Sequence, residues 1–151
     1  MSTADATPSV DRAHTRPDGA SDALVAATGT LSEALEKVER ARGALYEFHQ
    51  LTGGADAMLD DVVDGLRKTG HGDLADRVRD ELIGRNVIEG RWTFQVVEEF
   101  DDGYYTAFRE VERTVRDATM DGRRHVFEGE MKERRRSRGR EGHAATPSHP
   151  R

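Results

Sequence analysis

The sequence predicts an all-α fold, a small antiparallel bundle of four to five helices. Apolar residues recur every three or four positions over much of residues 30–136, which is the period of an amphipathic helix. Glycine-containing turns separate these stretches. The chain has no cysteine, which excludes a disulfide-rich fold. With 35% apolar and 34% charged residues, its 151 residues support one domain with a modest core.

The first helix is predicted from Thr30 to Thr52. Residues 1–29 are rich in small and polar side chains, so we expect a disordered N-terminal tail there. Thr30-Leu31-Ser32-Glu33 matches a capping box, and Gly53-Gly54 is expected to end the helix. Its apolar face is expected to contain Leu31, Ala34, Val38, Ala41, Leu45 and Phe48.

Two shorter helices should follow, over residues 55–68 and 73–83. The turn-forming sequence Thr69-Gly70-His71-Gly72 separates them. A turn this short predicts that the two helices form an antiparallel hairpin.

The segment from Trp92 to Phe108 contains six of the nine aromatic residues and allows two structures. Apolar and aromatic side chains follow helical steps from Phe94 as far as Val115, passing through Gly103 without interruption. A hairpin is the alternative, because Asp102-Gly103 is a typical turn dipeptide flanked by alternating residues. The pattern favours the helix, because a hairpin here would form an isolated two-stranded sheet of marginal stability.

Charge divides the chain. The first 122 residues carry 25 acidic and 14 basic side chains, whereas residues 123–140 carry 8 basic and 3 acidic ones. We expect a last helix from Arg123 to about Arg138 and a disordered basic tail over residues 137–151. We expect no contact with nucleic acid except through this C-terminal segment, where Arg134, Arg135 and Arg136 are the candidates for binding phosphate or an acidic partner.

The candidates for a chemical site are few, and no catalytic residue is predicted. Asp101 can lie on an apolar helix face, where burial would raise the pKa of its carboxyl group. The alternative places Asp101 at the flank of that face, solvated or paired with an arginine. Glu98, Asp101 and His49 could form a metal or small-molecule site, but their spacing does not match the Glu-x-x-His pairs of di-metal bundles.

The functional prediction is therefore a non-enzymatic interaction or regulatory protein. Its partner could be a second copy, as a homodimer, or another protein. Trp92, Tyr104 and Tyr105 are the predicted contact residues, because each combines a large apolar ring with a polar group. The composition predicts a cytoplasmic protein without a membrane-spanning segment, and it identifies no cofactor.

Overall fold

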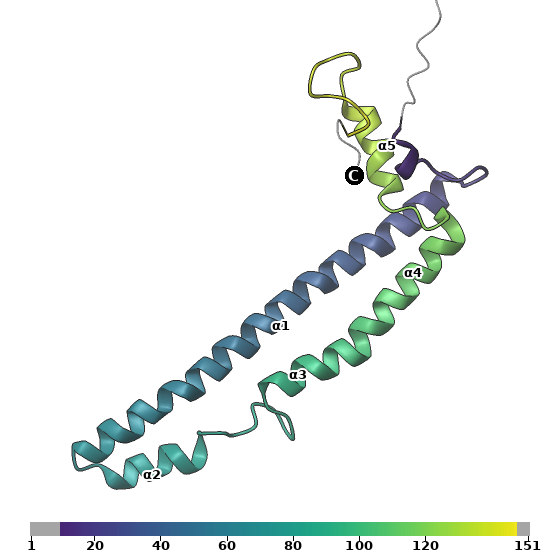
Figure 1. Cartoon of the computed structure of the whole chain (residues 1–151). Helices are drawn as coiled ribbons and strands as arrows, with labels where there is room; N and C mark the ends of the chain where they lie inside the picture. Colours follow the sequence, from purple (N-terminus) through teal and green to yellow (C-terminus); the bar gives the residue numbers. More distant parts are fainter. Residues whose placement is uncertain (1–9, 148–151) are drawn as a thin grey trace, which may run out of the picture. The chain divides into compact units, whose positions relative to one another are not determined.

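A computed structural model describes residues 10–147, and within this range the fold is all-α (Figure 1). The predicted fold class is confirmed. The elements in chain order are the 3-10 turn η1 (Arg12–His14), α1 (Asp22–Lys68), α2 (Gly72–Glu81), α3 (Thr93–Phe100), the π-helical segment η2 (Asp101–Tyr105), α4 (Thr106–Met120) and α5 (Val126–Arg135). None of the described helices is both long and apolar enough to cross a membrane.

Helix α1 is longer than predicted at its N-terminal end and is not interrupted. It begins at Asp22, and residues 12–14 before it form η1, so the prediction of a disordered tail is wrong for residues 12–14 and 22–29. Val25 and Thr28 are buried there, and this packing offsets the ordering entropy that the composition alone could not. The disorder predicted for residues 1–9 and 148–151 lies outside the described residues, and residues 137–147 have no regular helix.

The predicted helix end at Gly53-Gly54 is also wrong, because α1 continues to Lys68. Contacts on both sides of the pair hold the helix. The imidazole of His49 forms a hydrogen bond with the hydroxyl of Thr93, with 2.8 Å between Nδ1 and Oγ1. Asp56 Oδ1 accepts a hydrogen bond from the backbone amide of Gly84 at 2.8 Å. Glycine lowers helix stability by only about 1 kcal/mol per residue, so tertiary packing can outweigh it. The predicted turn at residues 69–72 is confirmed, with Gly70 in the left-handed region.

The aromatic segment is helical, and the hairpin alternative is wrong. The helical conformation runs from Thr93 to Met120 through α3, η2 and α4. The only β pairing among the described residues is an isolated bridge between Ile88 and Arg91. In η2 the Thr106 amide bonds to the carbonyl of Asp101, five residues earlier, which defines a π turn.

The described chain divides into two compact units, where the sequence predicted one domain over residues 30–136. The first unit consists of the residues up to Glu36 and from Arg109 onward, and the second is Lys37–Phe108. The first unit has a small core of Val25, Met120 and Val126. Thr28 and Thr119 hydrogen-bond beside this core, so the two helices that carry them are joined there by hydroxyl groups.

In the second unit, the contacts run in opposite directions along α1 and the helical segment that begins at Thr93. His49 bonds Thr93, Arg42 bonds Asp101, and Glu39 accepts from Tyr105. In these three pairs the residue number decreases along α1 as it increases along α3 and η2, so these helices are antiparallel within this unit. Buried Val63 and Ala75 lie in α1 and α2, which are joined by the turn at residues 69–71.

Alanine at Gly53 or Gly54 is expected to raise the free energy of unfolding by roughly 0.5–1 kcal/mol per substitution. A Cβ atom at either position meets nothing within 4 Å, so only the gain in helix propensity remains. Chemical denaturation followed by circular dichroism measures the change. Gly29→Ala is the control with a smaller gain, because its Cβ would lie 3.1 Å from the Cβ of Phe127. An unchanged or lower stability for Gly53→Ala and Gly54→Ala would contradict the prediction.

Candidate interaction surface

The three predicted contact residues lie in different environments of the second unit. Trp92 is half-buried at the start of α3, where its amide donates to the side chain of Gln95 at 2.8 Å. Tyr105 is buried, whereas Tyr104 is 59% exposed. Of the three, only Tyr104 offers most of its ring to solvent, and the contact role of all three stays a prediction.

The π turn explains why Tyr105, rather than Tyr104, lies in the core. A straight helix would carry its buried face from Val97 to Phe100 or Asp101 and then to Tyr104. The wider π turn adds one residue, so the inward positions are Val97, Asp101 and Tyr105, in two steps of four. A periodicity of 3.6 residues cannot reveal such an insertion.

Asp101 is paired with an arginine, as the alternative to deep burial predicted. Arg42 donates from Nε to Oδ1 at 2.7 Å and from Nη2 to Oδ2 at 3.1 Å. This two-point hydrogen bond holds the pKa of the Asp101 carboxyl below its ordinary value. The carboxylate is therefore ionised and held in place, which is the opposite of the raised pKa expected for an unpaired buried acid.

Two tyrosine rings enclose the same arginine. The Arg42 guanidinium lies 4.7 Å from the ring centre of Tyr105 and 5.0 Å from that of Tyr46. The Tyr105 hydroxyl donates to both carboxylate oxygens of Glu39 at 2.8 Å. We call Glu39, Arg42, Tyr46, Asp101 and Tyr105 the Arg42 cluster. Its polar groups form hydrogen bonds with one another, so the cluster fixes α1 against η2 within the second unit.

Glu98, Asp101 and His49 do not share a common ligand-binding position in the structure. His49 bonds the hydroxyl of buried Thr93, Asp101 bonds Arg42, and the Glu98 side chain is exposed. Within residues 10–147, no group of three His, Asp or Glu side chains is arranged to hold a metal ion. A ligand role for these residues stays a prediction.

The arginine-rich segment lies in the first unit and is partly neutralised. Arg136 forms an ion pair with Glu133, and Arg138 donates to the same carboxylate at 2.8 Å. Arg134 and Arg135 are exposed. A phosphate-binding or acidic-partner role for Arg134, Arg135 and Arg136 stays a prediction.

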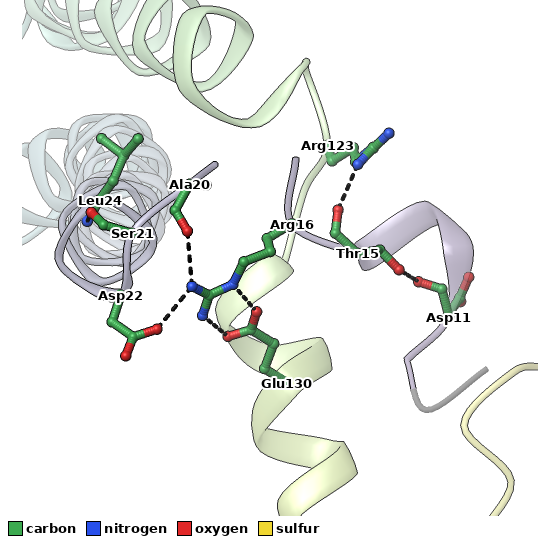
Figure 2. Close-up of polar contacts among 9 residues, drawn as sticks. All are labelled: Asp11, Thr15, Arg16, Ala20, Ser21, Asp22, Leu24, Arg123 and Glu130. Atoms are coloured by element: carbon green, nitrogen blue, oxygen red, sulfur yellow. Dashed lines mark hydrogen bonds and ion pairs between the residues drawn. The ribbon is translucent and has the colours of Figure 1, made fainter. Parts of the chain in front are cut away.

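Arg16 makes four side-chain hydrogen bonds in the first unit (Figure 2). It donates to both oxygens of Glu130 at 2.6 and 2.8 Å, and also to Asp22 and the carbonyl of Ala20. These bonds lower the pKa of the Glu130 carboxyl and fasten the segment before α1 to α5. Arg16 thus has a structural role.

The second unit exposes a continuous apolar stripe along α1 that the sequence analysis missed. Its members are all exposed and follow strictly alternating steps of three and four residues. They are Ala41, Ala44, Phe48, Leu51, Ala55, Met58 and Val62. We call these seven residues the α1 stripe. The predicted core positions Ala41 and Phe48 belong to this exposed stripe, so their predicted burial is wrong.

A different face of α1 makes the contacts inside the second unit. Arg42, His49 and Asp56 hydrogen-bond residues of η2, α3 and the loop after α2, respectively. In the stripe, Met58 is 70% exposed, Leu51 67% and Phe48 41%. Single exposed apolar residues are ordinary, but a contiguous row of them marks a binding surface. The alternating three- and four-residue spacing of the stripe is present in the sequence. A helix that ends at Gly53-Gly54 divides this pattern into two short segments, so the full stripe is not predicted.

The comparisons with known proteins found no relative. No protein-family model, curated protein or solved structure matches the chain. The function must therefore be inferred from the surface of the molecule.

Tyr105→Phe is expected to lower the free energy of unfolding by about 1 kcal/mol, because it removes the hydroxyl that donates to Glu39. Tyr104→Phe is the matched control, since it removes the same atom from an exposed ring and should leave stability within about 0.5 kcal/mol of wild type. Urea denaturation measures both. Equal effects at the two positions would contradict the assigned role of the π turn.

Asp101→Asn is expected to destabilise the protein less at low pH than at neutral pH. The folded-state pKa of Asp101 lies below its ordinary value of 3.8, so the stabilising contribution of the carboxylate is present above about pH 4. It is lost as the pH falls through the folded-state pKa. Denaturation of wild type and Asp101→Asn between about pH 6 and pH 2 should show the gap in stability narrowing. A gap that is independent of pH would contradict the ion pair with Arg42, and Asp102→Asn is the exposed neighbouring control.

Proposed function

We propose that this chain is a non-enzymatic interaction protein that self-associates through the α1 stripe. The observation that carries the proposal is the row of seven exposed apolar residues at alternating three- and four-residue spacing. This spacing is the sequence pattern by which two helices pack side chains into each other's gaps. This spacing suits another helix as the partner, and a second copy of the chain supplies one with the same stripe.

The small core supports the same proposal. Among the described residues, the buried apolar set is Val25, Val63, Ala75, Val97, Tyr105, Met120 and Val126, and only two of these side chains are larger than valine. Phe48, Leu51 and Met58 are larger than valine as well, yet they remain in contact with water. Burial of each such side chain contributes roughly 1.5–3 kcal/mol, so association of the stripe has a substantial driving force. Exposure of these residues would otherwise favour nonspecific aggregation.

A cytoplasmic location belongs to the proposal, since the chain has no cysteine. The bonded state of Asp101 and His49 supports an interaction protein over a ligand-binding one, because both groups already have partners within the second unit.

Leu51→Glu is expected to convert a dimer into a monomer. A carboxylate in the middle of the stripe would be buried without a partner on association, which should weaken the dimer roughly tenfold or more. Sedimentation velocity over a concentration series should give twice the chain mass of 16.8 kDa for wild type and the single mass for the variant. Circular dichroism should show the same helix content, because Leu51 is exposed in the isolated chain.

Gln50→Glu is the matched control for this experiment. It adds the same charge one residue away, at an exposed position outside the stripe, and should remain dimeric. A wild-type protein that stays monomeric up to the highest soluble concentration would overturn the proposal. Equal weakening by the two variants would also overturn it, because a general effect of negative charge would then explain the result.

A further inference from the structure

The charges beside the α1 stripe determine how two copies can pair. We propose that the second copy binds antiparallel, with Phe48 against Leu51 of the partner subunit and Arg40 paired with Asp61 of the partner subunit. This inference rests on the proposed self-association and adds its orientation and register. It follows from the positions of four exposed side chains in a regular helix.

The stripe defines a heptad register along α1. Ala41, Phe48, Ala55 and Val62 take one of the two core positions, and Ala44, Leu51 and Met58 take the other. On one flank of the stripe, each first core position is preceded by a residue that lies beside the interface. These flanking residues are Arg40, Glu47, Gly54 and Asp61, and all four are exposed. Neither Arg40 nor Asp61 is ion-paired within the described residues.

An antiparallel pair of helices brings this flank against the same flank of the second copy. With Phe48 opposite Leu51 of the partner subunit, Ala44 lies opposite Ala55 and Ala41 opposite Met58. The flanking residues then pair Arg40 with Asp61 and Glu47 with uncharged Gly54. A two-fold axis repeats each contact, so the dimer contains two Arg40–Asp61 pairs at opposite ends of the interface.

Other arrangements lose this complementarity. A shift of one heptad toward the C-terminus places Glu47 opposite Asp61 and Arg40 opposite Lys68, which are like charges. The opposite shift places Glu47 against Glu47 of the partner subunit. A parallel dimer would place Arg40, Glu47 and Asp61 beside Leu45, Thr52 and Leu66 of the partner subunit, which offer no opposite charge. Charge therefore selects the antiparallel register, because like charges across an interface disfavour it.

Cysteine cross-linking tests the orientation, since the wild-type chain has no cysteine of its own. Full-length Ala44→Cys and Ala55→Cys variants, one carrying a size tag, are mixed and oxidised. The antiparallel register predicts a disulfide between the two different chains, because positions 44 and 55 face each other across the axis. Ala44→Cys alone should not cross-link, since its two copies would be separated by 11 residues of helix, or about 16 Å.

Gln50→Cys is the control for random collision, because it is exposed outside the stripe. The result that overturns the inference is a dimer in which Ala44→Cys cross-links to itself, which would show parallel helices. A wild-type monomer would instead overturn the proposed function. Sedimentation of the uncross-linked protein distinguishes these two failures.

Charge reversal tests the register. Arg40→Asp turns both ion pairs into like-charge contacts and should weaken dimerisation roughly tenfold, and Asp61→Arg should do the same. The double variant Arg40→Asp/Asp61→Arg restores opposite charges and should recover most of the wild-type affinity. Higher salt should reduce all three differences, because exposed charges are screened. Two single variants that leave the dimer unchanged, or a double variant that is weaker than either, would overturn the Arg40–Asp61 contact.

Discussion

Hydrogen bonds from polar side chains on the inward face of α1 set the register of its neighbours, and the rest of the structure depends on this constraint. These side chains lie among half-buried apolar residues such as Leu45 and Leu59. In the second unit, Arg42, His49 and Asp56 make the cross-helix hydrogen bonds. In the first unit, Ser32 bonds buried Glu112, and Thr28 bonds Thr119. A chain with few fully buried large apolar residues relies on such bonds to align its helices, since hydrogen bonds require a defined register whereas apolar contacts tolerate sliding.

The α1 stripe takes no part in these hydrogen bonds and remains available to a partner. The Arg42 cluster and the His49–Thr93 bond align α1 within its unit without using Phe48, Leu51 or Met58. Hydrogen bonds contribute little net free energy but strongly disfavour alternative registers. The face of α1 that carries these hydrogen bonds also carries half-buried Leu45 and Leu59, while the α1 stripe on another face is left for association. In the first unit, Arg16 acts in the same way by joining Glu130 and Asp22.

The helical nature of the chain and the turn after Lys68 could be read from periodicity and glycine placement. The continuity of α1 could not, because propensity at Gly53-Gly54 is local while the bonds of His49 and Asp56 are not. The same limit affected the choice of the inward face. An apolar pattern does not identify Arg42, His49 and Ser32 as inward residues, because their side chains are polar, and it predicts Ala41 and Phe48 there instead. The pairing of Asp101 was anticipated as an alternative, but its partner lies 59 residues away and is not visible in the sequence.

The π turn at Asp101–Tyr105 has a consequence for how this chain tolerates insertions and deletions. Each residue advances a helix by about 100°, so the extra residue sets the phase of every side chain downstream as far as Met120. Deleting one residue from Asp102-Gly103 would produce a more regular helix and yet turn Tyr105 out of its buried position in the second unit. The π turn thus fixes the helical phase between α3 and α4, and a one-residue deletion near it would need a one-residue insertion nearby to restore that phase.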